Sequence, residues 1–267
     1  PGSGCGCKIE PSKLHEVLKS SNFDPNQSFD KLIVGHDQND DAAVLDIGNG
    51  QALVHSTDFF TPIVDNPFDF GNIAGSNAIS DIYAMGASPD MALAILGWPI
   101  DKFGSKMAGE VLAGARESCK KAGIPLAGGH SIDIPQPIFG LSVTGRVGIG
   151  ELKKNNGARP GDLLYLTKPL GIGVIATAMK KELANDDDTK WALKTMKKLN
   201  FEGAELSGIT GVNAMTDITG FGLAGHLHEM MKASNCSALI DYDSIPKYNY
   251  SRSVSYTHLR AHETRIH

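Results

Sequence analysis

Alternating hydrophobic and polar residues predict a β-sheet in the first half of the chain. Residues 42–47 and 51–57 have strand composition, and Gly48–Gly50 between them is an Asn-Gly turn typical of a β-hairpin. The clearest alternation covers 138–149, where every second side chain is apolar. The apolar run 91–98 has the length of a strand. These segments predict a sheet with one buried face.

Apolar residues at helical spacing lie between these strands. A short helix is predicted over 11–19, and a second helix over 70–85. Residues 105–122 carry apolar side chains at steps of three and four, which predicts an amphipathic helix. Strands and helices therefore mix in a fold of the α+β class.

The polar stretch 151–162 marks a change in composition and a predicted domain boundary. Beyond it, Asp186–Asp188 is interpreted as a solvated loop. The other elements predicted there are strands at 163–167, 214–216 and 237–242 and helices at 172–181, 191–199 and 217–231. We expect a mobile arm (1–10), a first domain (11–155), a second α/β domain (156–250) and a tail (251–267) that is disordered or an artefact.

Composition excludes several classes of protein. Hydrophobic residues make up 41% and charged residues 21%, which is ordinary for a soluble globular protein. The net charge is −5 and no basic stripe is present, so nucleic acid is not expected as a partner. No apolar run approaches the roughly 20 residues of a membrane span, so no membrane segment is predicted. The chain has four cysteines, two of them one residue apart, so we expect a reducing cytoplasm rather than a disulfide framework.

Several carboxylates stand where an apolar element stops or turns, mostly beside small polar residues and without a basic neighbour. Such carboxylates on rigid elements are suited to holding Mg²⁺ against a nucleotide triphosphate. A solvated acidic turn is the alternative for Asp40 and Asp41, and an exposed polar stripe is the alternative for Asp81. The carboxylates at such positions are Asp40, Asp41, Asp58, Asp81, Asp133 and Asp217.

Three of these aspartates carry more information than the others. Asp40 and Asp41 precede a strand, and successive side chains alternate, so the two cannot face the same way. One can bind a metal while the other holds backbone or ribose. Asp81 lies one helical turn after Asn77, which places both on one face of the predicted helix.

Two glycine-rich segments add candidate chemistry. In Gly4–Lys8 (GCGCK), the lysine stabilises a thiolate, which makes a reactive cysteine one interpretation; half of a metal site and a chance terminal sequence are the others. Gly128–Ser131 (GGHS) suits either close approach to a phosphate or a tight hairpin, and it is not a P-loop. With no catalytic triad or zinc signature, Mg²⁺-dependent phosphoryl transfer is the natural class.

Eight motifs in order along residues 1–247 resemble the selenide, water dikinase (selenophosphate synthetase) family. That family shares a two-domain ATP-binding fold with aminoimidazole ribonucleotide synthetase and thiamine-monophosphate kinase, and the cysteine arm distinguishes it from them. The motifs are GCGCKI (4–9), DDAAV (40–44), STDFF (56–60), NAISD (77–81), ILGWP (95–99), GGHSID (128–133), LTKPLG (166–171) and MTD (215–217).

The resemblance implies ATP-dependent formation of selenophosphate from selenide and water, with release of AMP and phosphate. It implies an aminoimidazole ribonucleotide synthetase-like fold, with an N-terminal mixed sheet or half-barrel that binds ATP and, with its helices, forms a homodimer. An α/β sandwich would follow, and the arm would close over the nucleotide. The family continues beyond Lys247, so we expect this second domain to be incomplete here and to leave apolar faces unburied.

The resemblance also implies roles for single residues. Cys5 would be the catalytic cysteine and Lys8 the catalytic lysine, with Mg²⁺, and a monovalent cation such as K⁺, as cofactors. Asp41, Asp81 and Asp217 would bind Mg²⁺. The residues implied to contact ATP are Lys8, Gln38, Asn39, Asp40, Asp58, Asp81, Gly129, His130 and Ser131. Another Mg²⁺-ATP-dependent kinase or synthetase of the same superfamily, or a non-catalytic dimerising paralogue, are the alternatives.

Overall fold

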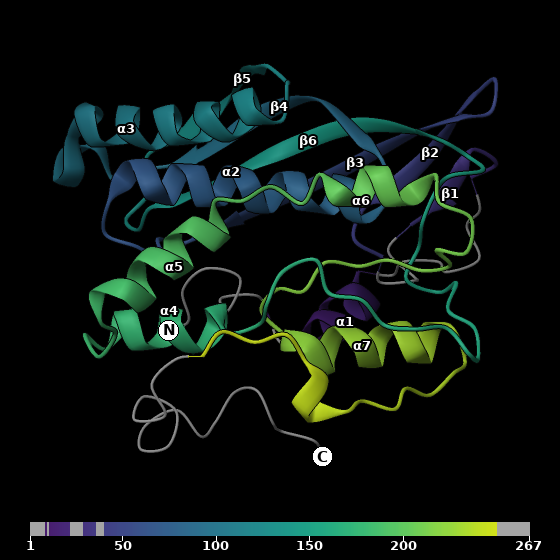
Figure 1. The fold of residues 1–267 in the computed structure, drawn as a ribbon. Helices are drawn as coiled ribbons and strands as arrows, with labels where there is room; N and C mark the ends of the chain where they lie inside the picture. The colour runs from purple at the N-terminus through teal and green to yellow at the C-terminus, as the bar shows by residue number, and fades with distance from the viewer. Residues whose placement is uncertain (1–8, 10, 22–28, 36–39, 250–267) are drawn as a thin grey trace.

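A computed structural model describes residues 9, 11–21, 29–35 and 40–249, and the first half of the chain forms a six-stranded sheet (Figure 1). The strand order is β1-β2-β3-β6-β4-β5. β4 and β5 run parallel, and the other neighbouring pairs run antiparallel. The strands are β1 (Leu32–Val34), β2 (Ala43–Gly48), β3 (Gln51–Phe60), β4 (Ser88–Gly97), β5 (Leu126–Ile132) and β6 (Ile138–Gly148).

The predicted hairpin is confirmed between β2 and β3, which pair antiparallel around the Asn-Gly turn. Asn49 has φ 54° and Gly50 has φ 71°. Two successive residues with positive φ give a turn whose twist matches that of the flanking strands, and Asn followed by Gly adopts this conformation readily. The strands predicted at 91–98 and 138–149 are also present, as β4 and β6.

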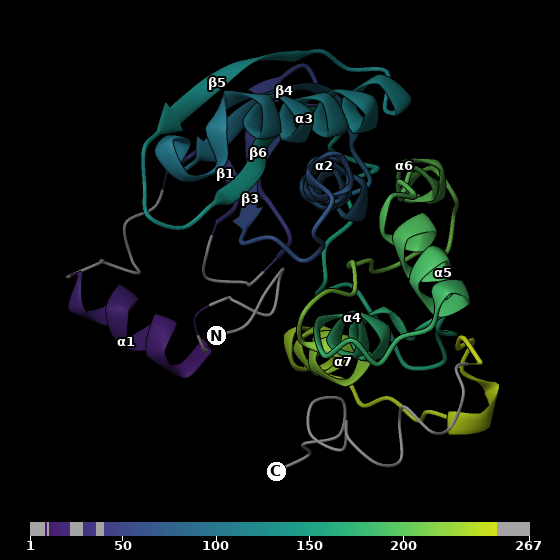
Figure 2. The same cartoon turned by 90° about the vertical axis from the view of Figure 1, so that its left-hand side faces the viewer.

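Helices α2 (Pro67–Ala84) and α3 (Ile100–Lys121) cover one face of the sheet, and α1 (Pro11–Ser20) lies apart from it (Figure 2). α2 is buried on nearly every side, and Phe70 packs against Phe139 of β6 with ring centroids 6.2 Å apart. At Gly71 the backbones of α2 and α3 approach so closely that a Cβ there would lie 1.8 Å from the Val111 carbonyl oxygen. α2 is therefore the central element of the core.

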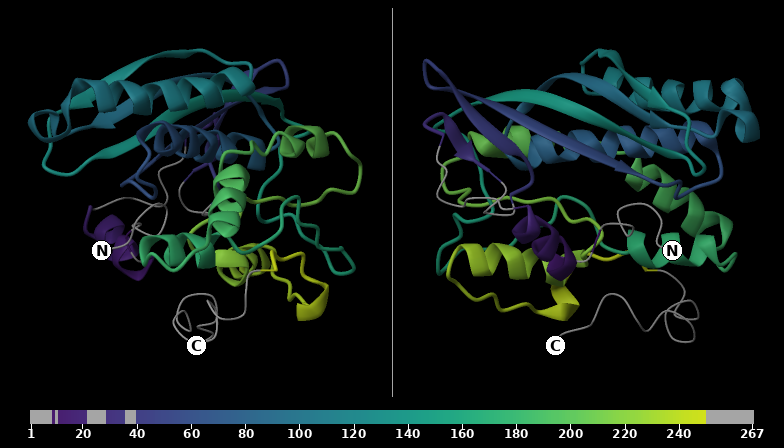
Figure 3. Two further views of the ribbon diagram at one scale, coloured as in Figure 1. Left: turned by 60° about the vertical axis from the view of Figure 1, so that its left-hand side comes forward. Right: turned by 180° about the vertical axis from the view of Figure 1, so that it is seen from behind.

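The second half of the chain consists of α4 (Ile172–Lys180), α5 (Asp186–Met196), α6 (Glu202–Ser207), α7 (Gly222–Ala233) and a short 3₁₀ helix at Tyr242–Ser244. Figures 1 and 3 show α4 and α7 away from the sheet and α6 beside α2. The approach of α6 is close, because a Cβ at Gly203 would lie 2.3 Å from the Tyr83 carbonyl oxygen. The two halves of the chain thus meet along α2.

The strands predicted in the second half are wrong. Among the described residues after β6, the one β-pairing is the isolated bridge between Leu170 and Lys247. A strand needs a hydrogen-bonded neighbour, and none lies beside the apolar segments there. In 163–167 and 237–242 several apolar side chains are exposed instead, as at Tyr165 (83%) and Leu239 (98%). The predictions that fail are 163–167, 214–216 and 237–242.

Three local predictions also need correction. Asp186–Asp188 is the first turn of α5 rather than a loop, because Asn185 caps the helix by accepting a hydrogen bond from the Asp188 N–H. Acidic side chains are favourable there because they face the positive end of the helix dipole. The helix predicted from residue 217 begins at Gly222, and the glycine pair Gly128–Gly129 lies inside β5 rather than in a hairpin.

No helix in the described part of the chain combines the length and the apolar character needed to cross a membrane.

Candidate magnesium site

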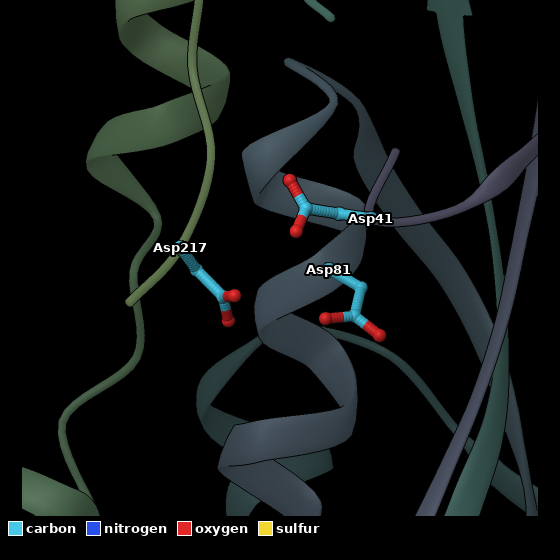
Figure 4. A group of neighbouring side chains, drawn as sticks. All are labelled: Asp41, Asp81 and Asp217. Carbon is cyan, nitrogen blue, oxygen red and sulfur yellow. The ribbon is translucent and has the colours of Figure 1, made fainter. Parts of the chain in front are cut away.

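Three of the predicted carboxylates meet at one place. Asp41 precedes β2, Asp81 lies on α2, and Asp217 lies in a segment without regular secondary structure (Figure 4). One carboxylate oxygen from each lies within 4.8 Å of those from the other two. All three residues are half-buried. Residues separated by up to 176 positions in sequence are therefore assembled into one group of oxygen ligands.

Hydroxyl groups orient all three carboxylates. Ser56 Oγ on β3 donates to Asp81 Oδ2 at 2.5 Å, and Ser80 Oγ on α2 donates to Asp217 Oδ2 at 2.6 Å. Thr216 Oγ1 donates to Asp41 Oδ1 at 3.1 Å. Such hydrogen bonds around metal-binding side chains fix the direction in which their oxygens point.

The electrostatics of the cluster favour a bound cation. Burial raises the pKa of Asp81 well above its ordinary value, and the charges of Asp217, Asp41 and Asp58 raise it further, against the smaller lowering effect of the hydrogen bond from Ser56. Two unit charges 4.8 Å apart repel by about 3.5 kcal/mol at an effective dielectric constant of 20. Full ionisation of the cluster is therefore costly without a cation, and three carboxylates are the hard oxygen ligands that Mg²⁺ prefers.

Asp40 and Asp41 face different ways, as their adjacency predicts. Asp40 Oδ1 accepts a hydrogen bond from the backbone N–H of Asn155 at 2.7 Å, whereas Asp41 joins the cluster. Asp58 Oδ2 accepts from Asn77 Nδ2 at 2.5 Å. Asp40 thus connects the start of β2 to the segment 151–162, where a domain boundary was predicted. Asp58 lies beside the cluster.

A pocket of about 260 Å³ lies beside Asp41. It is lined by Gly35, Asp40, Asp41, Ala42, Ala43, His55, Ser56 and Thr57. A larger groove of about 590 Å³ contains none of the predicted site residues. Five lysines line it, three of which form ion pairs with Glu117, Asp69 and Glu202. We therefore associate the chemistry with the smaller pocket, which adjoins the carboxylates.

A basic group from the second half of the chain also influences the cluster. The Lys168 ammonium donates to the Lys198 carbonyl oxygen. Burial lowers the pKa of Lys168 to about 8, and the positive charge of Lys198 contributes to this, while Glu202 and Asp217 act in the opposite direction. Asp217 therefore has a cation in its electrostatic surroundings that the sequence did not indicate.

The remaining predicted residues lie elsewhere. Gly129, His130 and Ser131 are exposed on β5 at the sheet edge. β4 and β6 separate this strand from β3, a distance of about 14 Å at the usual strand spacing. Within one chain they do not join the carboxylate cluster. Cys5, Lys8, Gln38 and Asn39 lie outside the described residues.

Sequence reasoning missed several partners of the carboxylates. Ser56 and Ser80 belong to motifs that were recognised, but no pattern assigned their hydroxyl groups a role. Asn200, which donates to Ser80 Oγ at 2.7 Å, had no sequence signal at all. A polar residue in a loop becomes informative only when its neighbours in space are known.

Comparison with known proteins places this chain in a family. Residues 39–147 match the model of the AIR synthase related protein N-terminal domain, and 159–263 match that of the C-terminal domain. Selenide, water dikinase of Escherichia coli strain K12 is 55% identical over 249 residues, which cover 92% of this chain and 70% of that protein. The chain belongs to the selenide, water dikinase family. The corresponding protein of Yersinia pseudotuberculosis is 54% identical over the same length.

Solved structures of other proteins resemble the fold of this chain. Thiamine-monophosphate kinase from Stenotrophomonas maltophilia superimposes with a TM-score of 0.66 at 22% identity, over 88% of this chain and 76% of that one. Hydrogenase maturation protein HypE in complex with ATP superimposes with a TM-score of 0.56 at 21% identity, over 86% and 67%. Together with the two matched domain models, these likenesses confirm the predicted AIR synthase-like α+β fold.

Proposed function

We propose that this chain forms selenophosphate from ATP, selenide and water, releasing AMP and phosphate, and that Asp41, Asp81 and Asp217 hold Mg²⁺ for the reaction. Membership of the selenide, water dikinase family supports the activity. The observation that carries the proposed site is the convergence of three carboxylate oxygens within 4.8 Å from three separate segments.

The residues fit this role in charge and in ligand type. Bound Mg²⁺ offsets the charge of a triphosphate and polarises its phosphorus atoms. Ser56 and Thr216 hold the carboxylates of Asp81 and Asp41, so their oxygens are oriented before a ligand arrives. Because burial and the neighbouring aspartates raise the pKa of Asp81, a bound cation favours the ionised form of this carboxylate. A monovalent cation such as K⁺ completes the proposed cofactors.

Further residues complete the proposed site. Lys8 neutralises the negative charge that develops during phosphoryl transfer. The Cys5 thiol is the catalytic nucleophile that interacts with the selenium substrate. The proposed contacts to ATP from one chain are Lys8, Gln38, Asn39, Asp40, Asp58 and Asp81. Gly129, His130 and Ser131 lie three strands from the cluster of their own chain, so we propose that they contact ATP from the second copy in the homodimer.

An anaerobic assay tests the proposal. Purified protein is incubated with ATP, Mg²⁺ and K⁺, with and without selenide; nucleotides are separated by chromatography and selenophosphate is detected by ³¹P NMR. We expect AMP and selenophosphate to form together only when selenide is present. Asp217→Asn and Lys8→Ala should abolish both products, whereas Asp65→Asn, at an exposed position outside the cluster, should not. ADP as the final product, formed without selenide, would indicate another kinase of the superfamily.

The face of the sheet opposite α2 and α3 supports the proposed homodimer. Phe59, Met91 and Leu93 point to this face and are 48%, 43% and 40% exposed. Contiguous exposed apolar side chains commonly mark protein interfaces, and we propose that a second copy of the chain covers them. In sedimentation velocity, Leu93→Glu should shift a dimer to monomer. Leu239→Glu, at a fully exposed position elsewhere, should not, and an unshifted Leu93→Glu dimer would contradict this interface.

A further inference from the structure

Two hydrogen bonds in series lead from Asn200 to a carboxylate of the proposed magnesium site. Asn200 Nδ2 donates to Ser80 Oγ at 2.7 Å, and Ser80 Oγ donates to Asp217 Oδ2 at 2.6 Å. Ser80 is buried and Asn200 is half-buried. We propose that Ser80 and Asn200 are positioning residues that orient the Asp217 carboxylate for Mg²⁺; this rests on the metal role proposed above.

The chemistry of the three groups fixes the direction of the series. An ionised carboxylate can only accept hydrogen bonds, so the single Ser80 hydroxyl proton must point to Asp217. The Ser80 oxygen then has only lone pairs left, and it needs a donor on its other side. The Asn200 amide must therefore present its NH₂ group, which agrees with the observed orientation. Each hydrogen bond in the series has only one possible direction, so the loss of Asn200 leaves the Ser80 oxygen without this donor and disturbs the bond to Asp217.

Asp217 needs such support more than the other two carboxylates. Asp81 is held by helix α2, and Asp41 directly precedes the paired strand β2. Asp217 has no regular secondary structure on either side, because α7 begins only at Gly222. Ser80 is the residue before Asp81 on α2. The hydrogen bond from Ser80 therefore ties Asp217 to the same rigid helix that carries its partner ligand.

The segment that carries Asn200 is itself docked on α2. Lys197 Nζ forms an ion pair with Asp69 at 2.8 Å, and Ser76 Oγ donates to the Lys197 carbonyl oxygen at 3.4 Å. Asp69, Ser76 and Ser80 all belong to α2. Asn200 thus approaches Ser80 from a segment already fixed to that helix, and its amide is in place to hold the hydroxyl.

Metal binding in the absence of substrate tests directly whether the hydrogen bonds from Asn200 to Ser80 and from Ser80 to Asp217 orient the carboxylate. Free Mn²⁺ is titrated into metal-free protein and measured by electron paramagnetic resonance, in the absence of ATP and selenide. Ser80→Ala and Asn200→Ala should each weaken Mn²⁺ binding by about 10- to 100-fold, the usual effect of removing a group that orients a metal ligand. The double variant should lose about as much as either single variant, because the two groups act in series.

Ser207→Ala is the matched control. Ser207 is a buried serine on α6 whose Oγ donates to the Ala204 carbonyl oxygen of the same helix at 2.7 Å rather than to a carboxylate. Its variant should bind Mn²⁺ like the wild type. Circular dichroism and urea unfolding establish that each variant is folded, and Asn200→Ala provides an independent test should Ser80→Ala fail to fold.

The possible outcomes distinguish a failure of the positioning role of Ser80 and Asn200 from a failure of the proposed function. If folded Ser80→Ala or Asn200→Ala binds Mn²⁺ as tightly as the wild type, the positioning role is wrong, whatever the enzyme makes. Strictly additive losses in the double variant would also overturn the series arrangement. Absence of Mn²⁺ binding by the wild type would instead overturn the metal role of the three aspartates. In turnover, a positioning role predicts a higher Mg²⁺ requirement with kcat largely restored at saturating Mg²⁺.

Discussion

Replacing Asp81 by Asn should stabilise the metal-free protein at neutral and alkaline pH. The Asp81 oxygen lies within 4.8 Å of oxygens of Asp41 and Asp217. Each such pair repels by about 3.5 kcal/mol at an effective dielectric constant of 20, and the substitution removes two of the three pairs. The raised pKa of Asp81 favours proton binding, which relieves part of this repulsion in the wild type. We therefore expect a net gain of about 1–2 kcal/mol in the free energy of unfolding, the usual size for relieving a destabilised functional site.

The sign of the pH dependence follows from the direction of the pKa shift. Burial, and then the neighbouring aspartates, raise the pKa of Asp81 in the folded protein above its value in the unfolded chain. The folded state therefore binds more protons between these two values. The stabilising contribution is complete below the unfolded pKa of about 4 and is lost as pH rises through the raised folded value. The advantage of Asp81→Asn over the wild type must grow over that window.

Urea unfolding in EDTA at several pH values between 5 and 8, followed by circular dichroism, measures this advantage. Asp65→Asn, an exposed position, is the control and should show no such trend. Saturating Mg²⁺ should reverse the order of stability, because a neutral amide binds Mg²⁺ less well than a carboxylate. The electrostatic reasoning would be refuted if the metal-free Asp81→Asn variant were less stable than the wild type at pH 8. It would also be refuted if the difference in free energy of unfolding between the two were the same at every pH.

Three further predictions follow from the fold and from the pKa shifts. Gly71→Ala should lower the free energy of unfolding by about 1–3 kcal/mol, because a Cβ there would lie 1.8 Å from the Val111 carbonyl oxygen. Gly109→Ala, where a Cβ meets nothing within 4 Å, should be neutral or stabilising by about 0.5–1 kcal/mol in the same urea titration. The pKa of Lys168 is lowered to about 8, so its acetylation by acetic anhydride, followed by mass spectrometry, should reach half its maximal rate near that pH. Burial raises the pKa of Cys119 to about 11, so its thiol should react with Ellman's reagent only after unfolding; rapid reaction in the native protein would contradict the packing.

Local patterns in the sequence predicted those helices and strands whose own residues show a clear helical spacing or strand alternation. The alternation around the Asn-Gly turn predicted the hairpin of β2 and β3, and helical spacing predicted α2 and the face shared by Asn77 and Asp81. The same reasoning failed for the strand at 163–167, where apolar residues of high strand propensity have no neighbouring strand to pair with. Strand formation depends on such a neighbour, which lies elsewhere in the sequence.

For the candidate site too, some features could be predicted from the sequence and others depended on the tertiary structure. The residue types alone indicated that Asp41, Asp81 and Asp217 are suited to a divalent cation, since each borders or interrupts an apolar element without a basic neighbour in sequence. Tertiary structure decided that their oxygens lie within 4.8 Å, that Gly129 lies three strands away, and that Asn200 supports Asp217 through Ser80. Side-chain chemistry is a property of each residue and can be read locally. Distance and burial arise only when segments far apart in the chain pack together on α2, and they set the pKa of Asp81 and the orientation of its partners.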